Sequence, residues 1–236
     1  MLTLSQQAID AAVDRGVQII SMSWTIKQPE NNSEEKKKFD AAVRRAVDAG
    51  ILMFCSAGDK GSHQDNDYPA ASSPGKMLRI GAAKANGNAW DWVGDINNLD
   101  FIIPGHQIVE RPTDEDPQNF QMQTGSSVAT ALGAGLAALI ISCVQLAAIH
   151  TQISQQVAQA ASVTPTAITV KDLTDVKKHV SMKAAFDAVG TSRESQNKFI
   201  EVWKVFDKAA KEMKPLEKDK RLGVVAALAP KFVRLT

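Results

Sequence analysis

Cysteine is scarce in this chain of 236 residues, and neither sign of charge dominates it. The two cysteines, Cys55 and Cys143, both lie in apolar runs, and two are too few for a disulfide framework. Lysine and arginine number 27 against 26 aspartates and glutamates, so the net charge is +1. A balance this close to zero gives no support for a nucleic-acid partner or an anionic membrane surface, and we expect neither.

A hydrophobic segment is also lacking in residues 1–10, which mix polar and apolar side chains, so we expect no secretory leader. The one stretch that could cross a bilayer, residues 129–149, contains no charged residue. Its many alanines and glycines, with Thr130, Ser142 and Gln145 among them, favour a fully buried central helix instead. These absences favour an intracellular protein in a reducing compartment.

The first sixty residues repeat one order of elements: an amphipathic helix, a glycine and a short apolar strand. Gly16 precedes the apolar run 17–22, and Gly50 precedes a second run at 51–55. Ser33 is placed to cap the second helix. Helices that lead into short, nearly unbroken apolar strands predict a parallel α/β sheet with helices on both faces.

The remainder of the chain divides into loops, the uncharged helix and a helical end. Two further strands are predicted at 77–82 and 99–103. We expect an α/β domain over residues 1–160 and a mainly helical C-terminal extension over 161–236. The extension should contain an amphipathic helix whose apolar side is formed by residues at helical spacing, namely Phe199, Trp203, Phe206, Ala210 and Met213.

The sharpest chemical feature is the segment Thr124-Gly125-Ser126-Ser127-Val128-Ala129-Thr130, directly before the uncharged helix. A serine at a helix N-terminus lies beside unpaired backbone N–H groups and the positive end of the helix dipole, which would stabilise an oxyanion. Gly125 lets a substrate approach the backbone. Taken alone, this spacing favours the simpler interpretation that one of the two serines only caps the helix.

Other segments occur in a recognisable order before the serine motif. They are a predicted helix and strand at residues 8–13 and 19–23, the predicted loop Ser56-Ala57-Gly58-Asp59-Lys60-Gly61, and the short segments Tyr68-Pro69-Ala70 and Pro104-Gly105. In this order the chain resembles the subtilisin-like serine proteases (subtilases) over somewhat more than half its length. The resemblance implies the family's α/β parallel-sheet fold. It also implies that the N-terminal part of that fold is missing, because the family's catalytic Asp and His precede the first helix seen here.

The same resemblance assigns roles to individual residues. It places the nucleophile at Ser127, because Gly-Ser-Ser-Val-Ala is similar to the family's Gly-Thr-Ser-Met-Ala. Ser23 and Trp24 would lie on the strand edge that pairs with an extended peptide, and Gly58 and Gly125 would line the same binding site. A tryptophan that merely covers the sheet edge explains Trp24 equally well.

Two departures from the family's pattern bear on catalysis. Asp59 stands at the oxyanion-hole position, where the family usually has Asn. An amide donates an N–H to a developing oxyanion, whereas a carboxylate only accepts, so Asp59 weakens the case for catalysis. Ala131 replaces the proline that usually follows the nucleophile motif, which removes a helix-start signal but no reactive group.

No histidine of the chain stands in the family's catalytic setting. We interpret His63 as a loop residue, because a histidine without a paired carboxylate is poor evidence for catalysis. The Asp65-Asn66-Asp67 segment offers oxygens to a Ca²⁺ ion but fits a polar turn better, so no metal or cofactor is expected. The other histidines also lie after the first helix: His106, His150 and His179.

Two functions are consistent with these observations. The first is a serine endopeptidase that cleaves peptide bonds through Ser127, incomplete here because its base and orienting acid would lie upstream of Met1. The alternative is an inactive relative, a peptide-binding or protein-interaction module that kept the fold and lost the chemistry. A truncated product without activity of its own is a third possibility. In each case we expect the chain alone to be inactive.

Overall fold

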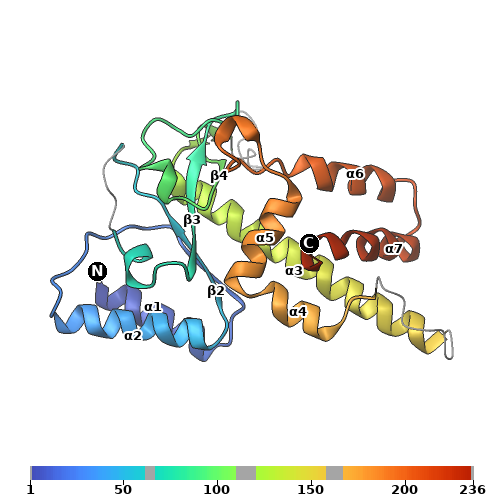
Figure 1. The fold of residues 1–236 in the computed structure, drawn as a ribbon, viewed down its shortest axis with the longest axis horizontal. Coiled ribbons are helices and arrows are strands. Elements are labelled where there is room, and N and C mark those ends of the chain that lie inside the picture. Colours follow the sequence, from blue (N-terminus) through green and yellow to red (C-terminus); the bar gives the residue numbers. More distant parts are fainter. Residues whose placement is uncertain (1, 62–66, 110–120, 158–166, 235–236) are drawn as a thin grey trace. The chain divides into compact units, whose positions relative to one another are not determined.

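A computed structural model describes residues 2–61, 67–109, 121–157 and 167–234, which form two compact units (Figure 1). Unit 1 comprises Met1–Gly135 with Ser192–Phe199. Unit 2 comprises Leu136–Thr191 with Ile200–Thr236. The division of the sequence into domains at residue 160 stays a prediction.

Unit 1 is built on a four-stranded parallel sheet whose strand order follows the chain. Each pair is in regular register: Ile19 lies opposite Leu52 and Met53 lies opposite Met77. The predicted parallel pairing of the first two strands is therefore confirmed. The strands are β1 (Ile19–Met22), β2 (Leu52–Ser56), β3 (Met77–Ala83) and β4 (Phe101–Pro104), and a separate antiparallel pair joins β5 (Ile108–Val109) to β6 (Met122–Gln123).

Helices cover both faces of this sheet, as the sequence predicts. Helices α1 (Leu2–Asp14) and α2 (Glu34–Asp48) lie side by side (Figure 1). Their apolar side chains form one cluster with Met53 of β2 and Met77 of β3. On the other face, the beginning of helix α3 (Ser126–Val157) approaches closely at Gly133, where an added Cβ would lie 3.1 Å from Ile103 Cδ1. Successive side chains of a strand point to opposite faces of the sheet, and in the buried strands both sets are mainly apolar. Both faces therefore need to be covered by helices.

The predicted helix signals of unit 1 are also present. Ser33 Oγ accepts a hydrogen bond from Lys36 N–H at 3.3 Å and caps α2. Gly16 and Gly50 follow the first two helices in left-handed conformations. Both cysteines are buried and neither forms a disulfide. Burial raises the pKa of the Cys143 thiol above its ordinary value, which lowers its reactivity.

Helix α3 begins in unit 1 and continues into unit 2. Within it, residues Ser126–Gln155 are long and apolar enough to cross a membrane by length and composition, but 56% of the most apolar window is buried in the protein. The prediction of a helix buried all round is wrong for part of its surface, since one side buries Ala137, Ile140 and Val144 while the opposite side is exposed. Large apolar side chains on the exposed side are Leu132, Leu139, Leu146, Ile149 and Ile153.

Unit 2 contains short helices around the second part of α3. Helix α4 opens with a capping box, in which the side chains of Thr169 and Asp172 each accept a hydrogen bond from the other residue's backbone N–H. Elsewhere in unit 2, the rings of Phe206 and Phe232 stack with their centroids 6.1 Å apart. The helices are α4 (Val170–Val176), α5 (His179–Val189), α6 (Trp203–Met213), α7 (Lys218–Leu228) and α8 (Pro230–Val233), and the described 3₁₀ turns of the whole chain are Ala70–Ser72, Ile96–Asn98 and Arg193–Ser195.

The prediction for the helix near residue 200 is partly wrong. Phe199 lies outside α6 and pairs with Ile102 in a parallel bridge beside β4, where its ring covers Gly87. The buried residues of α6 are Val205 and Ala209, not the predicted apolar stripe. Phe199 fits the helical spacing by coincidence, because backbone pairing with a strand decides its place.

Candidate active site

The predicted site residues come together at the carboxyl ends of the parallel strands. Ser23 directly follows β1, and Gly58 and Asp59 follow β2. This edge is where open α/β sheets bind their ligands. Hydrogen bonds join Ser23 to Ser127 and Asp59 to Ser126, so segments 104 and 67 residues apart in the sequence meet at the start of α3.

Gly125 forms the turn into α3 with a φ of +147°, a conformation that favours glycine. Its N–H donates to the Gly105 carbonyl at 2.7 Å. A Cβ atom added to Gly125 would lie 3.2 Å from Asp59 Oδ2, which is tighter than an ordinary contact. Glycine therefore allows the main chain of this turn and the Asp59 side chain to lie together.

Ser126 is fully buried, and its polar atoms are all engaged. Its hydroxyl donates to Asp59 Oδ1 at 2.6 Å and accepts from Ala82 N–H at 3.1 Å. Its backbone N–H donates to Asp59 Oδ2 at 2.8 Å, and its carbonyl accepts from the Thr130 hydroxyl at 2.7 Å. These bonds fix the first turn of α3 to the sheet, which gives Ser126 a structural role.

Asp59 is half-buried, and both of its carboxylate oxygens accept hydrogen bonds from Ser126. In this arrangement the side chain of Asp59 holds the turn before Ser127 and satisfies an N–H group at the helix start. It donates nothing toward a substrate. Asp59 thus lies beside the predicted oxyanion site, but both of its carboxylate oxygens are occupied by hydrogen bonds from Ser126.

Ser127 is exposed at the second position of α3. Its hydroxyl donates to the Ser23 carbonyl at 2.9 Å, and the Ser23 hydroxyl donates to the Ser127 carbonyl at 3.0 Å. Its backbone N–H has no hydrogen-bond partner among the residues that the structure describes. The hydroxyl and this N–H therefore lie together at the positive end of the helix dipole.

The other two predicted binding residues lie nearby with different contacts. The Trp24 ring is half-buried and meets Phe39 of α2 edge-on, with centroids 6.0 Å apart, so it packs on the helical layer. The Gly58 carbonyl accepts from Gly94 N–H at 2.9 Å, which ties the Asp59 loop to a neighbouring segment. The contact of Trp24 agrees with the interpretation that it covers the sheet edge.

The described part of unit 1 includes one histidine. His106 follows Gly105, and its ring lies against Trp90 at 5.8 Å between centroids. His63 and the residues Asp65 and Asn66 of the proposed polar turn lie outside the described residues. His150 and His179 belong to unit 2.

Sequence reasoning missed the network that links Ser126 to Asp59 and Ala82. Ala82 contributes only its backbone N–H to this network, and almost every residue type has that group, so the sequence does not reveal this contact. The available signal was an aspartate at a position where the family usually has an amide, followed later by two consecutive serines. A carboxylate that accepts from the first serine explains both features together.

Replacing Asp59 with alanine is expected to lower the free energy of unfolding by about 1–3 kcal/mol, because the buried Ser126 would lose both acceptors. Asp59→Asn should cost less, because its carbonyl oxygen still accepts one of the two hydrogen bonds. Urea unfolding of the three proteins measures the difference. Equal losses for the two variants would contradict a role that depends on acceptor oxygens.

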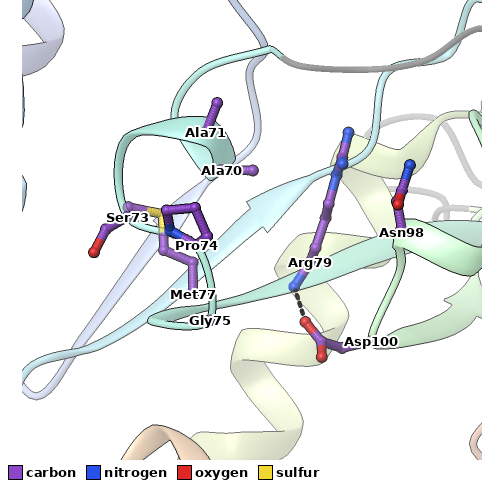
Figure 2. A pocket seen from close by; sticks show the side chains of 9 residues that line it. All are labelled: Ala70, Ala71, Ser73, Pro74, Gly75, Met77, Arg79, Asn98 and Asp100. Atoms are coloured by element: carbon purple, nitrogen blue, oxygen red, sulfur yellow. Dashed lines mark hydrogen bonds between the residues drawn. The ribbon is translucent and has the colours of Figure 1, made fainter.

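A separate pocket of about 310 Å³ lies elsewhere in unit 1, lined by none of the predicted catalytic or substrate-binding residues (Figure 2). The backbone N–H of Arg79 in β3 donates to Asp100 Oδ2 at 2.9 Å. Figure 2 shows the side chains of Arg79 and Asn98 extending alongside each other at one side of the pocket. Arg79 is 9% exposed, an unusual arginine in an otherwise apolar strand.

The parallel sheet, with helices on both faces and an exposed serine at the N-terminus of α3, makes this an α/β protein of the kind that the sequence predicts. The chain belongs to the subtilase family, whose sequence model matches residues 2–201. It is 30% identical over 138 residues to an intracellular serine protease of Paenibacillus polymyxa, and 29% identical over 136 residues to the major intracellular serine protease of Bacillus subtilis strain 168. These matches cover 57% and 56% of this chain, and the chain spans 39% of the length of each relative.

Solved structures show the same fold at lower identity. The self-cleaved protease domain of PatA matches with a TM-score of 0.58 at 19% identity, covering 88% of this chain and 68% of that one. The prenylagaramide maturation protease PagA matches with a TM-score of 0.56 at 19% identity, covering 86% and 66%. Coverage this high must include much of the chain beyond residue 160, so the similarity in fold extends into the C-terminal helices.

Proposed function

We propose that this chain is the nucleophile-bearing part of an intracellular serine endopeptidase that cleaves peptide bonds through Ser127. The observation that supports it best is the exposed Ser127 hydroxyl at the start of α3, beside a backbone N–H of the same residue that no described residue accepts from. A hydroxyl attacks a carbonyl carbon, and an N–H at that position donates to the oxygen that becomes negative. The intracellular location follows the names of the two relatives.

The reaction needs groups beyond those described. As Ser127 Oγ bonds to the carbonyl carbon, its proton must pass to a base and then to the leaving amine. We assign the base and its orienting acid to a histidine and an aspartate on a segment upstream of residue 1. An extended peptide or protein substrate would lie along the edge at Ser23, with the backbone of Gly58 and Gly125 beside it.

A test compares the longer gene product with its Ser127→Ala variant in a peptide-hydrolysis assay. We expect the longer protein to cleave and the variant to lose that activity, because the nucleophile is gone. Ser126→Ala is a poor control because it disturbs the buried network, whereas Ser142→Ala removes an exposed hydroxyl far along α3 and should leave the rate unchanged. Cleavage that persists in Ser127→Ala would contradict the assignment.

The second candidate function is an inactive, peptide-binding relative. The arrangement of Asp59 favours it, since both carboxylate oxygens accept from Ser126 and no amide stands at the oxyanion position. In that case the longer protein would bind extended peptides without cleaving them. Binding that survives in Ser127→Ala, together with no hydrolysis by either protein, would identify this function.

A further inference from the structure

Two reciprocal hydrogen bonds connect the end of β1 to the start of α3. The Ser127 hydroxyl donates to the Ser23 carbonyl at 2.9 Å, and the Ser23 hydroxyl donates to the Ser127 carbonyl at 3.0 Å. Both serines are exposed, and the bonds span 104 residues of sequence. Each residue therefore uses its side chain to hold the main chain of the other.

The two bonds act on different parts of the nucleophile. The Ser23 hydroxyl fixes the peptide group that follows Ser127, and the N–H of that group, on Val128, donates to the Gly125 carbonyl at 3.1 Å. The Ser23 carbonyl accepts the hydrogen bond that the Ser127 hydroxyl donates. A carbonyl is far too weak a base to remove that proton, so this contact holds the hydroxyl at rest without activating it.

We propose that Ser23 is a positioning residue for Ser127. Its hydroxyl fixes the backbone that carries the nucleophile, and its carbonyl holds the nucleophile's hydroxyl until a base receives the proton. The proposal rests on the proposed function, in which Ser127 is the nucleophile. The proposal adds a second role for Ser23. The residue lies on the strand edge predicted to pair with substrate, and it would also set the orientation of Ser127.

The test measures how fast a fluorophosphonate probe modifies Ser127 in the full chain, by intact-protein and peptide mass spectrometry from pH 6 to pH 10. In this reaction Ser127 Oγ bonds to phosphorus, fluoride leaves and the hydroxyl proton passes to solvent or buffer. Ser23→Ala removes one neutral hydrogen bond, so the rate should fall about three- to tenfold. Ser23→Thr keeps the hydroxyl and should retain at least half the rate.

Two further readouts separate positioning from a general loss of structure. Ser33→Ala removes the cap of α2, so it should lower stability while leaving Ser127 labelling unchanged. The pH midpoint of labelling should be the same in Ser23→Ala and the parent chain, because Ser23 does not titrate in this range. A Ser23→Ala rate equal to the parent rate, or a Ser23→Thr rate as low as that of Ser23→Ala, would overturn the proposal.

Failure of the proposed function gives a different result. If Ser127 reacts no faster than other exposed serines even when the upstream segment is added, its assignment as a nucleophile loses support. Positioning is then decided by amide hydrogen exchange over residues 127–130. Exchange there should quicken in Ser23→Ala and not in Ser23→Thr, and unchanged exchange in Ser23→Ala would overturn the positioning role.

Discussion

Labelling of Ser127 by a serine-directed phosphonate should rise by about 10²–10⁴-fold when an upstream segment with the family's catalytic His and Asp is added. The hydroxyl of the described chain donates to the Ser23 carbonyl, which cannot take its proton. A histidine within hydrogen-bond reach would take the proton as the new bond forms, and general-base catalysis contributes an acceleration of that order. The measurement is the labelling rate of the chain with the segment in cis or as a separate polypeptide.

Two variants make this comparison specific. Ser127→Ala should abolish the accelerated labelling, and replacing the histidine of the added segment should return the rate to that of the chain alone. Fast, Ser127-dependent labelling of the chain without the segment would contradict the account, and the search for a base would then start with His63. Absence of labelling with the segment present would favour the inactive, peptide-binding function.

Gly105→Ala is expected to destabilise unit 1 by about 1–3 kcal/mol or more, because the site has no room for a methyl group. A Cβ atom there would lie 2.8 Å from Ala82 Cβ, 2.9 Å from the Gly125 carbonyl oxygen and 3.0 Å from Ala129 Cβ. None of these atoms belongs to a flexible side chain that could move away. Relief requires β3 and the first turn of α3 to separate, which would also disturb Ser127, so both unfolding and labelling should change.

Gly135→Ala provides the matched control for this substitution. Gly135 lies within α3, is exposed, and an added Cβ would meet nothing within 4 Å. Alanine is the better helix former by about 1 kcal/mol, so this variant should be as stable as the parent or more stable. Urea unfolding decides the matter, and a Gly105→Ala protein as stable as Gly135→Ala would contradict the close packing described here.

Much of unit 1 was predictable because its signals are local. The strands are short apolar runs that follow glycines, and a serine such as Ser33 caps a helix through atoms three residues away. The parallel pairing of β1 with β2 follows because helices precede both strands. Resemblance to a family predicts the site residues Ser23, Asp59 and Ser127, whereas residue spacing alone favours a helix cap at one of the two serines.

The parts that sequence reasoning missed depend on contacts between distant segments. The link from Ser126 to Asp59 spans 67 residues and includes a backbone N–H of Ala82, which no residue type encodes. Phe199 has the spacing of a helical residue but lies in the bridge beside β4, because hydrogen bonds with a neighbouring strand outweigh a weak helical preference. Hydrophobic periodicity describes a single helix or strand, so it cannot predict when pairing with a distant strand outweighs a local helical preference.

The two edge strands of the sheet, β1 and β4, differ in how far their outer backbone groups are paired. Beside β4, the segment that contains Lys198 and Phe199 occupies part of the border, through the hydrogen bond from Ile102 N–H to the Lys198 carbonyl at 2.9 Å. Strand β1 ends the sheet at the other side, so among the described residues its outer N–H and C=O groups have no strand partner. A bare strand border recruits further strands. Extension of the sheet is therefore favoured next to β1, the strand that leads directly to Ser23 and its bonds with Ser127.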